Sequence, residues 1–78
     1  MPTVLRIGSY RFFFFSNEGT EPPHIHIQRD RALAKFWLNP VELAGSTSFS
    51  SIELRKIGKL VVEHEKTFLE SWHEYFTN

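Results

Sequence analysis

Hydrophobic and polar positions alternate with a period of two in the first half of the chain, as is typical of β-strands. The alternation predicts four strands, at Thr3–Ile7, Tyr10–Phe15, His24–Arg29 and Ala32–Leu38. Gly8 and Ser9 separate the first two, and a glycine in the first position suits a two-residue hairpin turn. Because the strands are short and closely spaced, we expect an antiparallel meander.

A run of four phenylalanines, Phe12 to Phe15, interrupts the alternation. Such a run places aromatic rings on both faces of one strand, so we expect this strand to be central and covered on both sides. The rings, together with Phe36 and Trp37, are expected in the core and not as a platform for stacking nucleobases. Because the sequence encodes only one helical layer, we expect a second copy of the chain to cover the other face of this strand, which predicts a homo-oligomer.

The pattern changes after Pro40 to a period near 3.6 that begins at Ser50. Residues 40–49 are interpreted as a connection, with room for one helical turn around residues 41–43. Ser50 and Glu53 match the spacing of a capping box, in which the two residues cap each other and the helix begins. The apolar stripe leaves Glu53 largely for solvent and includes Trp72 and Phe76, which are expected to anchor the helical part to the sheet.

The polar stretch from Glu63 to Lys66 is the expected place for a break in this helical part. A single helix from residue 50 to the end would be about 42 Å long, which exceeds the size of so small a domain. The sequence thus predicts one α+β domain over residues 1–78, with a sheet part (1–39), a connection (40–49) and a helical part (50–78). Its fold is a four-stranded antiparallel meander packed against one broken helix or two C-terminal helices.

The overall charge is balanced, with nine Lys and Arg against nine Asp and Glu. This balance argues against nucleic-acid binding through a general basic field, so any such binding needs a local patch. The chain has no cysteine, which excludes disulfides, zinc–thiolate sites and a cysteine nucleophile. We therefore expect a cytoplasmic protein, without a membrane span or a cleaved leader.

The strongest chemical signal is the pair His24 and His26, which follows two prolines. Alternation places His24, His26 and Gln28 on one face of the strand, with Ile25 and Ile27 on the other. Residues two apart on a strand lie about 6.5 Å from each other, so the two imidazoles are able to act on one ion or one phosphate.

Three uses of this pair are open. In the first, His24 and His26 are structural hydrogen-bonding residues on a half-exposed face. In the second, they bind a divalent transition metal such as Zn, Ni, Cu or Fe. This metal site needs a third ligand from Glu21, His64, His73 or a second copy.

In the third use, the pair contacts RNA. A metal-free ribonuclease needs a general base, a general acid and a cation for the charge of the phosphorane. His24 and His26 with Arg11 are the candidate catalytic group, and Arg6, Arg29 or Lys35 are alternative cations. The candidate binding residues are Glu21, Gln28 and Lys35.

Several short segments, taken in order, carry a family resemblance. They are Met1–Gly8, Tyr10–Phe14, Glu21–Ile27, Ala34–Leu38, Pro40–Leu43 and Trp72–Phe76. With them the chain resembles a small uncharacterised bacterial family, the domain of unknown function numbered forty-one-sixty. The resemblance implies one member of a two-gene unit, beside another small protein, of the kind often described as toxin–antitoxin components. It implies no catalytic residue.

The function expected from these observations is that of a small cytoplasmic, partner-binding protein of a bacterial two-gene module. It would be the toxin-like member, with RNA as its target and the product of a neighbouring gene as its partner. The alternatives are a small metal-binding domain built on His24 and His26, and a purely structural homo-oligomer. Whether the protein is an enzyme stays open at this point.

Overall fold

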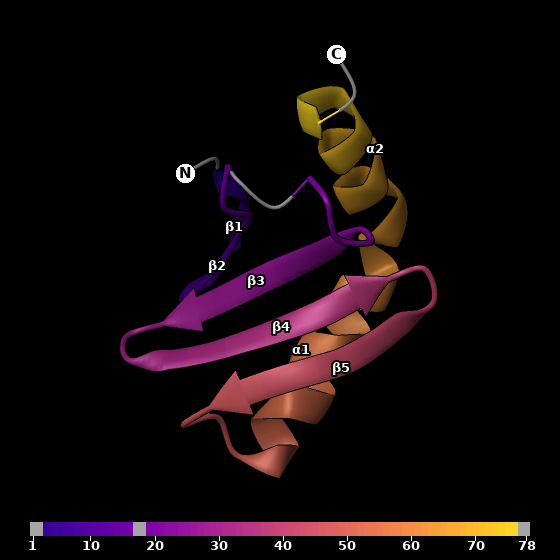
Figure 1. The fold of residues 1–78 in the computed structure, drawn as a ribbon. Coiled ribbons are helices and arrows are strands. Elements are labelled where there is room, and N and C mark those ends of the chain that lie inside the picture. Colours follow the sequence, from indigo (N-terminus) through magenta and orange to yellow (C-terminus); the bar gives the residue numbers. More distant parts are fainter. Residues whose placement is uncertain (1–2, 17–18, 77–78) are drawn as a thin grey trace.

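The computed structural model describes residues 3–16 and 19–76, and it has an α+β fold (Figure 1). An antiparallel sheet comes first in the chain and two helices follow it. The sheet has five strands, which lie side by side in chain order. The elements are β1 (Thr3–Ile7), β2 (Tyr10–Phe13), β3 (His24–Arg29), β4 (Ala32–Leu38), β5 (Val41–Thr47), α1 (Ser51–Glu63) and α2 (Glu65–Phe76).

The predicted meander is confirmed, but the prediction of four strands is wrong. Residues 41–47 were expected in a connection with a helical turn, and instead they form β5 along the edge of the sheet. The pairing runs from Leu38 opposite Val41 to Leu33 opposite Thr47, with one register shift near Lys35. Main-chain pairing with β4 thus holds a segment whose own side chains are mostly small and exposed.

The predicted start of the helical part is correct, although only half of the capping box forms. The side chain of Ser50 accepts a hydrogen bond from the Glu53 amide at 3.1 Å. The Glu53 carboxylate does not remain in solvent, because it accepts hydrogen bonds from the Arg29 guanidinium and from the Tyr10 hydroxyl. The first turn of α1 is therefore tied to β2 and β3.

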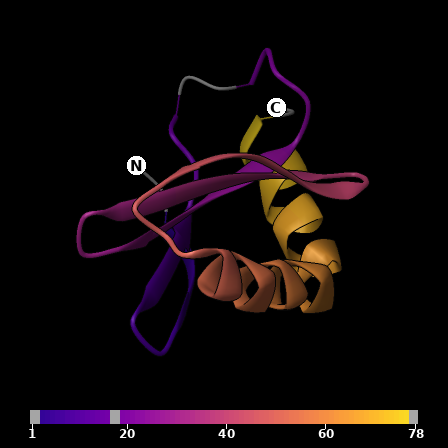
Figure 2. The same cartoon turned by 90° about the horizontal axis from the view of Figure 1, so that it is seen from below.

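The helical part divides at His64, within the polar stretch where the break was expected. The His64 amide still donates to the carbonyl of Leu60, and the Phe68 amide donates to the carbonyl of His64. α1 lies beneath the sheet, whereas α2 rises past the end at which β3 begins (Figures 1 and 2). The two helices consequently cover one face and one end of the sheet.

The core lies between the sheet and the helices, and aromatic rings join the two layers. Phe12 stacks on Phe68 with ring centroids 5.3 Å apart, and Phe14 meets Trp72 edge to face at the same distance. Other buried members are Ile25, Ile27, Ala34, Phe36, Leu38, Ile57 and Val61. Trp72 is 4% exposed, as expected of a residue that anchors the helical part.

The phenylalanine run needs less cover from outside than the sequence suggested. Phe12, Phe13 and Phe14 are all buried within one chain, while Phe15 is 39% exposed. The ring of Phe13 lies on the face away from the helices, where Arg11 and Phe15 cover it. The argument for a second copy therefore rests on Phe15 alone among these four rings.

Neither of the described helices has the length and apolar character that a membrane crossing requires.

Replacing Trp72 by alanine is expected to lower the free energy of unfolding by about 3 to 5 kcal/mol, because it leaves a cavity between α2 and the sheet. Chemical denaturation followed by circular dichroism measures this loss. Tyr75→Ala is the matched control, since Tyr75 lies on the same helix and is 44% exposed; it should cost about 1 kcal/mol or less. Similar stabilities for the Trp72→Ala and wild-type proteins would contradict the proposed anchoring.

Candidate functional site

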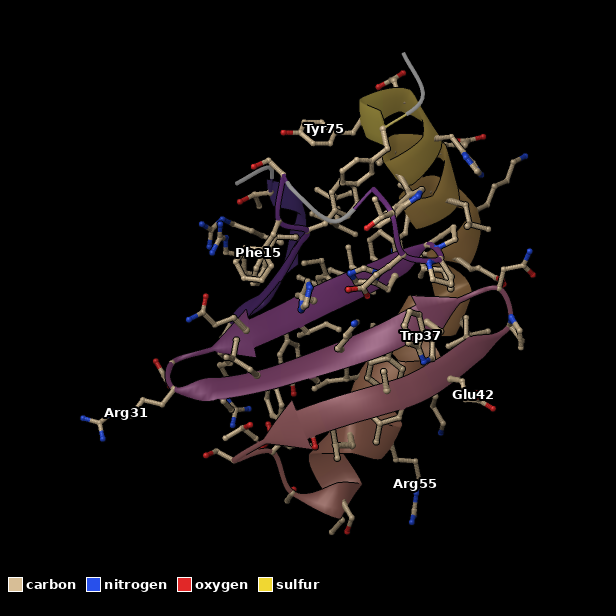
Figure 3. All side chains as sticks on the ribbon, viewed as in Figure 1. Phe15, Arg31, Trp37, Glu42, Arg55 and Tyr75 are labelled. Carbon is tan, nitrogen blue, oxygen red and sulfur yellow. The ribbon has the colours of Figure 1, made fainter. Side chains whose placement is uncertain are left out.

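The sheet has one face that α1 does not cover, and we call it the outer face. Side chains alternate between the two faces along each strand, so the strand register shows which of them lie on the outer face. They come from Thr3, Arg6, Arg11, Phe13, His24, His26, Gln28, Leu33, Lys35, Trp37, Glu42 and Thr47, with Phe15 just beyond the end of β2 and Gly45 opposite Lys35. Figure 3 looks onto this face and labels Phe15 and Trp37 toward its two ends.

Arg11 lies over an aromatic ring on the outer face of β2. Its guanidinium carbon is 4.4 Å from the centroid of the Phe13 ring. Its Nε donates to the Thr3 hydroxyl at 2.9 Å, and Nη1 donates to Oε1 of Gln28 at 3.3 Å. Two of the predicted site residues, Arg11 and Gln28, are therefore in direct contact.

Lys35 makes a similar pair with an aromatic ring on β4. Its Nζ lies 4.6 Å from the centroid of the Trp37 ring. The same ammonium group donates to Oε1 of Glu21 at 2.8 Å, which joins β4 to the loop before β3. Glu21 and Lys35, both predicted binding residues, are thus brought together.

His24 and His26 lie side by side between these two cation–aromatic pairs. Their ring centroids are 5.1 Å apart, as the alternation predicts for two residues on one face. The half-buried His26 ring stacks on Phe13 at 5.5 Å and meets Phe15 at 4.8 Å. His26 is therefore part of an aromatic cluster that reaches the solvent through Phe15.

His24 differs from His26 because it is fully buried. Its Nδ1 donates to the carbonyl of Pro22 at 2.9 Å and lies 3.9 Å from Oε1 of Glu21. Since a carbonyl oxygen only accepts, this hydrogen bond places a proton on Nδ1. The ring of Trp72 packs against it at 4.9 Å, because α2 rises past this end of the sheet. His24 therefore supports the fold locally and does not face the solvent.

The metal hypothesis gains no third ligand from the structure. Within residues 3–16 and 19–76, no group of three or more His, Cys, Asp or Glu side chains is arranged to hold a metal ion. Of the ligands considered, His64 and His73 belong to the helical part. The Nδ1 of His64 bonds to its own helix, at the carbonyl of Leu60.

A hollow of about 190 Å³ lies on the outer face, and most of its lining was not predicted. His26 and Lys35 belong to the predicted site, whereas Phe13 and Phe15 had been assigned to the core. The other lining residues are Leu33, Ala34, Gly45, Ser46 and Thr47. Only the pairing of β5 with β4 brings residues 45–47 here, so the strand that the sequence analysis missed also supplies one wall.

A larger groove of about 520 Å³ lies between β5 and α1. Phe36, Leu43 and Val62 are among its lining residues, and Lys59 is its single basic residue. It contains none of the predicted site residues. The outer face, and not this groove, therefore gathers the chemistry that the sequence indicated.

The two histidines should respond differently to replacement by alanine. His24→Ala is expected to lower the free energy of unfolding by about 2 kcal/mol or more, because it empties a fully buried position. His26→Ala should cost about 1 kcal/mol or less, since His26 is only half-buried. Thermal melting of both variants, with the exposed His73→Ala as the baseline, measures the difference. Equal melting temperatures for the two variants would show that burial of His24 contributes little.

Comparison with known proteins identifies the family. A family model described as Domain of unknown function (DUF4160) matches residues 9–73. No curated protein and no solved structure matches the chain. The matched segment contains β2 to β5, α1 and most of α2, and it includes every predicted site residue except the alternative cation Arg6. Since it spans well over half of the sequence, the chain belongs to the DUF4160 family.

Proposed function

We propose that the protein binds single-stranded RNA on its outer face. The observation that carries the proposal is the arrangement of cations over aromatic rings on β2 and β4, at Arg11 with Phe13 and at Lys35 with Trp37. Between them lies the aromatic cluster of His26 and Phe15. Sheet surfaces that bind single strands combine rings that stack on bases with cations that contact phosphates, and this face offers both groups.

The placement of charges favours the same face. The chain is neutral overall, so an anion is attracted only where the positive charges are concentrated. Arg29, which points to the helical side, is already neutralised by Glu53. The second helix carries Glu65, Glu70 and Glu74, which repel phosphates. Arg11 and Lys35, the latter also in contact with Glu21, are the basic groups that lie over rings of the outer face, where Phe15 is exposed.

The geometry supports binding better than cleavage. An acid–base mechanism with two histidines needs both imidazoles to reach the substrate. His24 is fully buried and donates to the main chain, so only His26 of the pair lies near the surface. We therefore propose RNA contact for His26, Arg11 and Lys35, and a structural role for His24.

The proposal extends to the cellular role. In this role the protein is the toxin-like member of a bacterial two-gene unit, and the product of the neighbouring gene is its partner. The family supports this part through the resemblance described above, and the exposed ring and cations of the outer face give such a protein a surface for its target. The metal-binding interpretation has less support, since the described residues bring no third ligand to the two histidines.

RNA binding is tested with a fluorescent single-stranded oligoribonucleotide and anisotropy at about 50 and 200 mM salt. Lys35→Ala should weaken binding and reduce its dependence on salt by about one ion, because one phosphate contact is lost. Trp37→Ala should weaken binding about tenfold by removing one stacking surface. Lys59→Ala removes the same charge from α1 and should bind as the wild type does. The proposal fails if the wild type does not bind, or if Lys59→Ala is as weak as Lys35→Ala.

The cellular role is tested by inducing the gene in a bacterial host with and without its neighbour. Induction alone should arrest growth, and co-expression of the neighbouring gene should restore it. Lys35→Ala should relieve much of the arrest at equal protein level, while Lys59→Ala should not. Normal growth upon induction of the wild type would remove the toxin-like role and leave the binding assay to decide on RNA.

A further inference from the structure

We infer that the hollow on the outer face holds one nucleobase of the bound strand, in the space above Gly45. This inference rests on the proposed function and deepens it. Four residues, one from each of β2 to β5, lie opposite each other in a row across the sheet: Phe13, His26, Lys35 and Gly45. The first three raise side chains above the sheet and the fourth has none, so the row ends in open space.

Left-handed backbone strain does not explain why position 45 is glycine, although the residue borders the register shift between β4 and β5. Gly45 does not adopt the left-handed conformation, which Gly8 does with a φ of +58°. A Cβ added at Gly45 would meet no heavy atom within 4 Å. Glycine within a strand costs about 0.5 to 1 kcal/mol relative to alanine and often marks a bulge or a close approach by a ligand. The position is therefore better explained by the space that it leaves open than by strain.

The size and walls of the hollow fit a single flat ring. At about 190 Å³ it is smaller than the 300 to 1,000 Å³ that is common for sites of whole small molecules. The rings of Phe15 and His26 meet at 68° on one side, so an incoming base is able to stack on one and contact the edge of the other. Lys35 and Thr47 supply polar groups for the edge of the base or for its phosphate.

A nucleobase fits this hollow better than a side chain of a second copy. Phe15 and Leu33 are 39% and 42% exposed, so the surroundings of the hollow are apolar enough to be covered by either. Arg11 and Lys35 lie on the same face, however, and two copies joined face to face would bring these like charges together. A polyanion neutralises the same charges while its base fills the hollow.

The test fills the hollow and compares an oligouridylate with an abasic oligomer of equal length. The wild type should bind the oligouridylate about tenfold more tightly than the abasic strand. Gly45→Leu should lose most of this preference, binding both strands alike, and should melt at or above the wild-type temperature. Ala44→Leu adds a similar bulk to the same strand outside the hollow and should keep the wild-type preference. Light scattering of each variant reports the oligomeric state.

The outcomes separate this inference from the proposed function. If the wild type binds the oligouridylate and Gly45→Leu keeps the full preference, the base site is wrong and RNA binding stands. If the wild type binds neither strand, the proposed function fails and the inference fails with it. If Gly45→Leu instead dissociates a dimer, the hollow is a contact between copies. Should Gly45→Leu not fold, uridine monophosphate added to the wild type must shift the amide resonances of Gly45 and Thr47 but not that of Val62.

Discussion

The architecture depends on aromatic packing between the helices and one face of the sheet. Phe12 on Phe68 and Phe14 on Trp72 join the two layers, and Phe14 also meets the ring of Phe76 at 5.7 Å. The two described helices cover that face and one end of the sheet. In the described part of the chain, the outer face is therefore covered only by its own side chains. It achieves this by laying Arg11 over Phe13 and Lys35 over Trp37, which keeps the rings partly dry while their cations stay hydrated.

Most of the fold follows from local patterns, and the parts that do not follow depend on distant contacts. The bounds of β1, β3 and β4 are those predicted, because strict alternation with turn residues between the strands specifies them. β5 was missed because Ala44 to Thr47 contain no large apolar residue, so only hydrogen bonds with β4 reveal a strand. The second half of the capping box also depends on a distant contact, and it does not form. Glu53 matches the local motif, yet a guanidinium from β3 competes for its carboxylate.

The sequence predicted which residues make up the site better than it predicted what each of them does. Alternation alone placed His24, His26 and Gln28 on one face, and the structure adds Arg11 and Lys35 beside them. The sequence could not show that α2 rises past the sheet and seals His24 under Trp72, since helix direction depends on tertiary packing. Nor could it separate Phe13 from Phe15, because identical neighbours in a run differ only in what covers them. Tertiary packing was the missing information in each case.

Two exposed apolar side chains and a missing side chain beside them on the outer face favour the same proposal. A protein of this size gains little by leaving Phe15 and Leu33 in water, and a glycine at position 45 weakens an edge strand further. Both features lower the stability of the free protein, and both are compensated if a ligand covers the rings and fills the space. The cations beside them are the reason that we propose an anionic ligand and not a second copy. The family model spans all four residues of the row, so the proposed base site lies within the segment that assigns the chain to its family.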